Sequence, residues 1–141
     1  MGRILVECPA CGACAVTESM STDAPGWFGA RRLTCTRCGL HRRWNERSIT
    51  RRSSREAVDD YFGLPLHLRA RCRRGMLWAF DQAHLDWLEL FVAAPLRGRA
   101  QRIDGGWSNG SAASRMPAWI KAASSREDVL KAIATMRARL P

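Results

Sequence analysis

The chain has 141 residues, of which 46% are hydrophobic and 26% charged, and its formal net charge is +10. These values are typical of a globular protein with a core, which excludes wholesale disorder, and no apolar run approaches the ~18 residues of a membrane span. The N-terminus has too few apolar residues for a signal peptide. We therefore expect a cytoplasmic protein of one or two small domains rather than a secreted or membrane-spanning one.

The positive charge is almost entirely arginine, since Lys121 and Lys131 are the only lysines. Residues 1–52 carry a net charge of +5, residues 53–94 of −1 and residues 95–141 of +6. Arginine suits phosphate and carboxylate contacts, so the two basic ends favour an acidic partner such as nucleic acid. A high-GC genome would also enrich arginine over lysine, and one sequence does not separate the two causes.

Two C-x-x-C-G motifs, separated by 23 residues, dominate the N-terminal third of the chain. Short strands are expected before and after each motif, at residues 4–6, 13–17, 31–34 and 40–44. Each motif forms a turn that brings two sulfurs to one side, and two such turns supply the four thiolates of a closed Zn²⁺ site. The predicted zinc ligands are Cys8, Cys11, Cys35 and Cys38.

Other readings of the cysteines stay open at this point. Cys14 and His41 are alternative ligands, because Cys14 forms a second C-x-x-C with Cys11 and His41 closely follows the second motif. Cys8 and Cys11 alone would also suit a redox pair, although that reading calls for a single motif in a βαβ context. Cys72 has no partner motif and is expected as a half-buried strand residue.

The two motifs, Cys8-Pro-Ala-Cys11-Gly and Cys35-Thr-Arg-Cys38-Gly-Leu, resemble those of zinc ribbons of the transcription factor IIB type, which also occur in many small bacterial proteins. The resemblance covers residues 1–47. It implies two zinc-binding turns at the tips of β-hairpins and a short three-stranded antiparallel sheet. Ribbons serve in transcription factors, ribosomal proteins, polymerase subunits and enzymes, so the resemblance does not decide the function.

The second ribbon hairpin is the predicted nucleic-acid-binding surface, because arginines there would neutralise phosphates and a tryptophan would stack on a base. Its candidate residues are Arg31, Arg32, Arg37, Arg42, Arg43 and Trp44. Trp27 is a second stacking candidate, and Arg47, Arg51 and Arg52 extend the basic tract. Strand alternation places Arg42 and Trp44 on one face and Arg43 on the other, so these arginines do not all form one patch. The competing interpretation is that the tryptophans are core residues and the arginines merely solvated.

The remainder of the chain predicts a mixture of strands and helices. A helix over 53–62 would start at a Ser53 capping box, and strands at 66–72 and 76–80 would form a hairpin. A helix over 82–94 with Asp81 as N-cap would bury an aromatic and aliphatic stripe, and two helices over 117–123 and 125–140 would close the chain. The Gly/Ser-rich segment between these helical regions is expected as a loop that carries further arginines. The expected class is α+β, with boundaries at 1–52 (zinc ribbon), 53–97, 98–114 (flexible loop) and 115–141.

No nucleophile, Walker, dinucleotide or zinc-protease motif is present, so we expect no enzyme. The sequence favours a zinc-stabilised protein that uses an arginine-rich ribbon hairpin, either to bind DNA or RNA or to act as an accessory of transcription or replication. The alternative is an adaptor that docks on a larger protein through a purely structural zinc site. Salt separates the two, because phosphate binding weakens steeply with salt while an apolar interface hardly changes.

Overall fold

The computed structural model describes residues 2–20, 29–45, 56–94 and 116–141. The chain divides into two compact units, Met1–Leu68 together with Pro141, and Arg69–Leu140. Each unit is described by itself. The predicted loop at 98–114, Trp27 and the tract from Arg47 to Arg52 lie outside the described residues.

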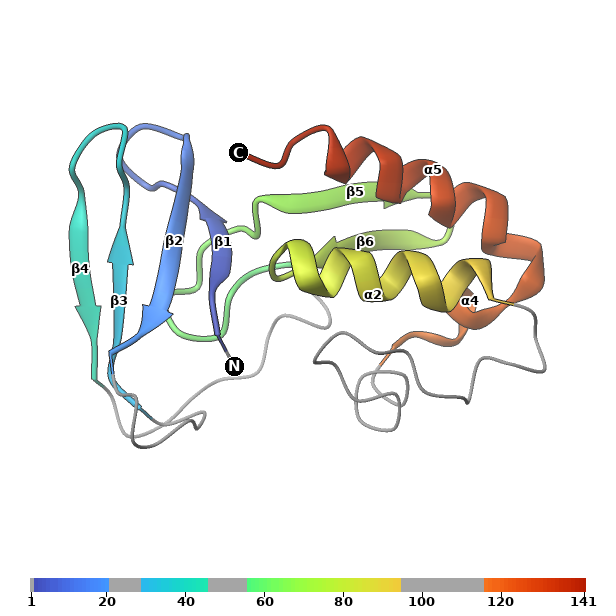
Figure 1. Cartoon of the computed structure of the whole chain (residues 1–141), viewed down its shortest axis with the longest axis horizontal. Helices are drawn as coiled ribbons and strands as arrows, with labels where there is room; N and C mark the ends of the chain where they lie inside the picture. The colour runs from blue at the N-terminus through green and yellow to red at the C-terminus, as the bar shows by residue number, and fades with distance from the viewer. Residues whose placement is uncertain (1, 21–28, 46–55, 95–115) are drawn as a thin grey trace. The chain divides into compact units, whose positions relative to one another are not determined.

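The first unit is built on a four-stranded antiparallel sheet in the order β1-β2-β3-β4. Its strands are β1 (Ile4–Glu7), β2 (Cys14–Ser19), β3 (Arg31–Thr34) and β4 (His41–Trp44). The β1–β2 and β3–β4 turns lie at the same end of the sheet (Figure 1). All four expected strands are confirmed. The three-stranded sheet implied by the ribbon resemblance is corrected to four strands.

One face of this sheet is the core of the first unit. Ile4, Val6 and Leu33 are at most 1% exposed. In β3 the buried residues alternate with exposed ones as a one-sided sheet requires, whereas in β1 the intervening Leu5 is buried as well. The chain after β4 adds to this core: the Glu7 N–H donates to the Pro65 carbonyl at 2.8 Å, and Val6 forms a bridge with Leu66. Residues beyond 52 thus belong to the first unit, so its limit at Leu68 differs from the expected boundary.

The helix predicted over 53–62 does not continue beyond Glu56, which is helical, so the prediction is wrong for residues 57–62. Ala57 has a φ of 53°, which a right-handed helix does not allow, and Val58 instead bridges to Pro65. The Asp59 carboxylate accepts hydrogen bonds from the backbone N–H groups of Tyr61, Phe62 and Leu64 at 2.7–2.9 Å. Aspartate therefore stabilises a turn here, a local bond that competes with helix. Ser53, the proposed cap, lies outside the described residues.

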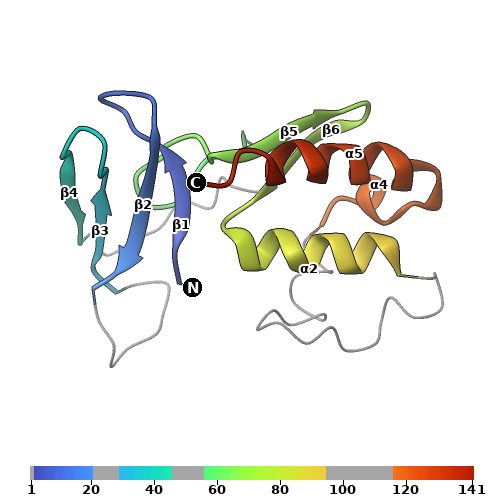
Figure 2. The same cartoon turned by 45° about the horizontal axis from the view of Figure 1, so that its top comes forward.

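The second unit combines a β-hairpin with helices. Its elements are β5 (Leu68–Cys72), which starts at the last residue of the first unit, β6 (Gly75–Ala79), α2 (Gln82–Ala93), α4 (Ala118–Lys121), the 3-10 helix η2 (Ala123–Ser125) and α5 (Arg126–Arg137). Helices α2 and α5 lie alongside each other and both contact β6 (Figures 1 and 2). This arrangement confirms the α+β class.

The core of the second unit follows the predicted helical stripes. Helix α2 buries Leu85, Trp87, Leu88, Phe91 and Val92, and α5 buries Val129, Ile133 and Met136. The N-cap prediction also holds, because the Asp81 carboxylate accepts the His84 backbone N–H at 2.8 Å. An isolated two-stranded hairpin is only marginally stable in water, so β5 and β6 depend on this helical layer for stability. Among the described helices, none is long and apolar enough to cross a membrane.

Candidate metal centre

Four cysteines from the two C-x-x-C turns form a compact cluster. The Sγ atoms of Cys8, Cys11, Cys35 and Cys38 all lie within 4.8 Å of one another. Two pairs cross between the turns: Cys8 Sγ lies 3.6 Å from Cys38 Sγ, and Cys11 Sγ lies 3.6 Å from Cys35 Sγ. The structure thus brings together the four residues that the spacing predicted as ligands.

The two turns position their sulfurs through the same local backbone pattern. In the first turn, Cys8 N–H donates to the Ala13 carbonyl at 2.7 Å, and Gly12 N–H donates to the Cys8 carbonyl at 2.9 Å. Cys35 and Gly39 repeat these bonds in the second turn, where Cys35 N–H donates to the carbonyl of the residue before β4 at 3.0 Å. Gly12 and Gly39 have φ angles of 76° and 78°, so the glycine after each motif supplies a backbone that other residues rarely adopt.

The surroundings of the sulfurs separate the pKa values of two of the thiols. Burial acts to raise the pKa of Cys8, but the backbone N–H groups of Cys11 and Ala10 outweigh it, together with neighbouring thiols, and lower the pKa to about 6. The Leu40 N–H acts to lower the pKa of Cys38, yet burial and hydrogen bonds with the other thiols raise it to about 12. Ionising all four thiols together therefore calls for a bound cation.

The cluster fits a tetrahedral zinc ion. Zn–S bonds of about 2.3 Å place the corners of a tetrahedron about 3.8 Å apart, close to the 3.6 Å between the sulfurs of each pair that crosses between the turns. Cys8 and Cys35 are buried, whereas Cys11 and Cys38 are exposed, so each turn contributes one buried and one exposed cysteine. Four thiolates complete the coordination of zinc and leave no position for a substrate.

The alternative cysteine and histidine ligands do not join this cluster. Cys14 begins β2, where its thiol donates to the Ala15 carbonyl at 3.8 Å, and the metal-binding group found among the described residues does not include it. His41 is exposed on β4 and is likewise outside the group. Cys72 is buried in β5, where burial first and the Asp128 carboxylate second raise its pKa to about 11. A high pKa keeps that thiol protonated and unreactive.

Two of the predicted nucleic-acid-binding residues are buried, which corrects the prediction for them. Arg31 is 1% exposed, and its guanidinium donates to the Gly2 carbonyl at 2.6 Å and to the Thr17 carbonyl and hydroxyl at 3.2 and 3.1 Å. It also lies 4.4 Å from the centre of the Tyr61 ring. Trp44 is 5% exposed and meets Tyr61 edge to face at 4.8 Å. Neither side chain can contact a phosphate or base from this position.

The other four predicted arginines are exposed. Arg32 and Arg43 lie opposite each other on β3 and β4, whereas Arg42 lies opposite the buried Leu33 and so belongs to the other face. Arg37 projects from the β3–β4 turn, within the second cysteine motif. This distribution agrees with the expectation that the arginines of this hairpin do not form a single patch.

A carboxylate that sequence reasoning missed lies beside this surface. Glu18 pairs with Arg3 at 3.5 Å and with Arg32 at 3.1 Å. Strand register places Glu18 next to Arg32 and Arg32 next to Arg43, which forms a row across the sheet. Because exposed ion pairs of this kind contribute only about 0–1 kcal/mol, Glu18 does not prevent Arg32 from exchanging partners.

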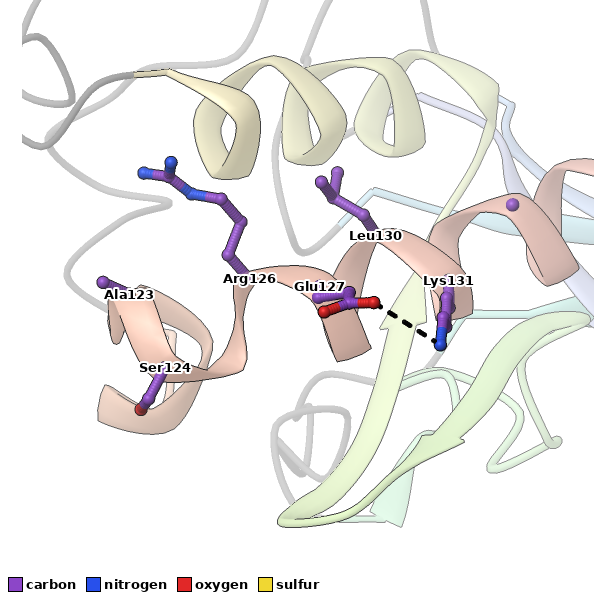
Figure 3. A pocket seen from close by; sticks show the side chains of 7 residues that line it. Ala123, Ser124, Arg126, Glu127, Leu130 and Lys131 are labelled. Carbon is purple, nitrogen blue, oxygen red and sulfur yellow. Dashed lines mark ion pairs between the residues drawn. The ribbon is translucent and has the colours of Figure 1, made fainter.

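The second unit contains an open groove that does not resemble a ligand site. It runs beside the start of α5 and is lined by residues including Arg126, Glu127, Leu130 and Lys131 (Figure 3). Glu127 and Lys131 pair with each other at 3.7 Å and are both largely exposed, while Arg126 donates to the Ala94 carbonyl at 3.2 Å. The polar groups of the groove are therefore directed to each other or to the backbone rather than converging on a ligand.

Comparisons with known proteins add no identification. No protein-family model, no curated protein and no solved structure matches this chain. The likeness to a zinc ribbon thus depends on the two cysteine motifs, their geometry and the antiparallel sheet that carries them.

Proposed function

We propose that this chain is a zinc-stabilised nucleic-acid-binding protein, acting as an accessory of transcription or replication. In this proposal Cys8, Cys11, Cys35 and Cys38 hold one Zn²⁺ ion, and the exposed arginines of the β3–β4 hairpin contact phosphate. The observation that carries the proposal is the four-thiol cluster, since it joins the β1–β2 and β3–β4 turns at one end of the sheet.

The role of the metal in this proposal is structural. A site closed by four thiolates offers no coordination position to a substrate, whereas catalytic zinc keeps one open. The metal instead joins two turns that are far apart in the sequence, so it would stabilise a sheet of only four short strands. We therefore propose a binding protein rather than an enzyme.

The phosphate contact is supported by exposure and charge. Arg32, Arg37 and Arg43 are exposed on or beside the turn that the metal would fix, and Arg42 adds charge at the edge strand. Of these four, only Arg32 forms an ion pair with another described residue. Guanidinium groups bind phosphate through two parallel hydrogen bonds, and a strand held in a sheet presents them in a defined order.

The experiment is a salt titration of binding to labelled single- and double-stranded DNA and RNA, with the zinc-loaded, nuclease-treated full chain. Binding is expected at low salt, and log affinity should fall linearly with log salt concentration. Arg37→Gln and Arg43→Gln should each reduce the slope by about 0.9 on duplex, or about 0.7 on single strands. Lys131→Gln is the matched control, because it removes one exposed positive charge from α5 in the second unit.

The proposal fails if the zinc-loaded chain binds no nucleic acid at low salt, or if the arginine variants have the slope of the control. A chain that binds a protein partner with little dependence on salt would instead support the adaptor alternative. The two outcomes are separated by the same titration, performed with nucleic acid or with the candidate protein.

A further inference from the structure

We infer that the β5–β6 hairpin of the second unit is a second phosphate-binding surface for nucleic acid, formed by Arg69, Arg71, Arg73 and Arg74. This inference depends on the proposed nucleic-acid binding, but it concerns different residues in a different unit. The net charge of −1 over residues 53–94 does not reveal this basic hairpin, because the six Asp and Glu residues of that segment, all outside the hairpin, outnumber the segment's five arginines.

Strand alternation places the arginines on the face turned away from the helices. Leu68 and Cys72 of β5 and Leu77 of β6 are at most 5% exposed, and α2 and α5 both contact β6. Arg69 and Arg71 alternate with these buried residues, so they lie on the opposite face. Two residues apart on one strand, their Cα atoms are about 6.6–6.8 Å from each other, which gives a regular row of charge.

The turn between the strands extends this row. Arg73 and Arg74 form the turn and are exposed, as is Arg71. Arg139 lies at the same edge, since its guanidinium donates to the Arg69 carbonyl at 3.4 Å. The sequence from residue 61 to residue 80 contains no Asp or Glu, so the hairpin itself has no carboxylate to neutralise its arginines.

The carboxylates of the described part of the second unit are engaged elsewhere. Asp81 caps α2, whereas Asp86 and Glu89 both pair with Arg137 on α5. Glu127 pairs with Lys131, and Asp128 accepts the backbone N–H of the hairpin turn rather than a side-chain guanidinium. Among the described residues, Asp128 is the one carboxylate with a hydrogen bond to the turn, and the hairpin retains a net positive charge around it.

An aromatic side chain on the same face favours nucleic acid over an acidic protein. Trp78 alternates with the buried Leu77 and Ala79 of β6, so it faces the same side as Arg69 and Arg71. It is half-buried, because its ring lies 4.9 Å from Phe80 and 5.7 Å from His84, near the start of α2, so only part of the ring remains exposed. A positively charged strand beside a partly exposed aromatic ring combines backbone contact with base stacking, the arrangement used for single-stranded nucleic acids.

The test is the salt titration of the zinc-loaded full chain with a single-stranded oligonucleotide and a duplex. Arg71→Gln, Arg74→Gln and their double variant are compared with Lys131→Gln. The replaced arginines are exposed and form no ion pair with another described residue, so the variants should keep the wild-type far-UV circular dichroism spectrum and melting temperature. We expect each single variant to lower the slope of log affinity against log salt by about 0.7 on single strands, and the double variant by about twice that amount.

The outcomes separate this inference from the proposed function. If wild type binds and Arg43→Gln lowers the slope while the Arg71/Arg74 double variant has the slope of Lys131→Gln, the hairpin is not a binding surface and the proposed function stands. If wild type binds no nucleic acid, both fail. Polyglutamate is the second probe. If the double variant no longer binds polyglutamate but still binds the oligonucleotide as the wild type does, the hairpin is a site for an acidic protein, and the inference is overturned.

Discussion

Replacing the buried Arg31 tests the distinction between structural and surface arginines in β3. Arg31→Met keeps much of the side-chain volume but removes the guanidinium that donates to the Thr17 carbonyl and hydroxyl. Both acceptors are buried, because Thr17 is 0% exposed. A buried acceptor left without a donor costs about 1–3 kcal/mol. Loss of the contact with the Tyr61 ring, 4.4 Å away, costs up to about 2 kcal/mol more in a desolvated site.

We therefore expect Arg31→Met to lower the free energy of unfolding of the first unit by about 3 kcal/mol or more, measured by urea denaturation of the zinc-loaded chain. The neighbouring Arg32→Met is the matched control. Arg32 is exposed and pairs with Glu18 at 3.1 Å, and surface pairs contribute about 0–1 kcal/mol. Oligonucleotide binding should respond in the opposite order, with Arg32→Met the weaker binder once both are folded. Equal stability of the two variants would refute the reasoning.

Three further predictions concern the metal, the turn glycines and a buried histidine. Chelation of the metal should abolish the dispersed amide signals of β1–β4 in an NMR spectrum, while those of α2 and α5 persist, because the metal would bind within the first unit alone; loss of both sets would contradict this. Gly39→Ala, at a φ of 78°, should destabilise the zinc-loaded chain by about 1–2 kcal/mol in urea denaturation, whereas Gly2→Ala, where an added Cβ meets nothing within 4 Å, should be neutral. Burial lowers the pKa of His84 to about 3, so below about pH 6.5 the unfolded chain binds a proton that the folded one does not, and stability should fall by up to about 1.4 kcal/mol per pH unit. Urea denaturation between pH 7.5 and 5 measures this, and a slope that His84→Asn leaves unchanged would rule it out.

The parts of the fold that follow from local patterns could be predicted from the sequence. The spacing of the cysteines located both metal-binding turns, because a C-x-x-C turn and its glycine are set by neighbouring residues. The Asp81 cap and the buried stripe of α2 also follow from residues within one helix. In each case the interactions that decide the structure lie within a few positions of one another.

The parts that failed depend on contacts between distant segments. Arg31 has the charge of a surface residue, and only its position two residues before the buried Leu33 indicated that it shares the inner face of β3. Its hydrogen-bond acceptors come from β2 and from residue 2, which a local pattern does not reveal. Residues 65–67 pair with β1, a contact that the local sequence pattern did not indicate, whereas the turn around Asp59 is set by local bonds to its carboxylate. The net charge of the segment 53–94 did not reveal the arginines of β5, because acidic residues outside the hairpin balance them.

Native mass spectrometry of the full chain, purified without chelator, tests the central claim most directly. The account predicts one zinc ion per chain, lost in Cys35→Ser and retained in Cys14→Ser, because the four sulfurs that lie within 4.8 Å of one another include Cys35 and not Cys14. A wild-type chain that carries well under one metal ion would contradict the account. So would a Cys14→Ser variant that loses the metal.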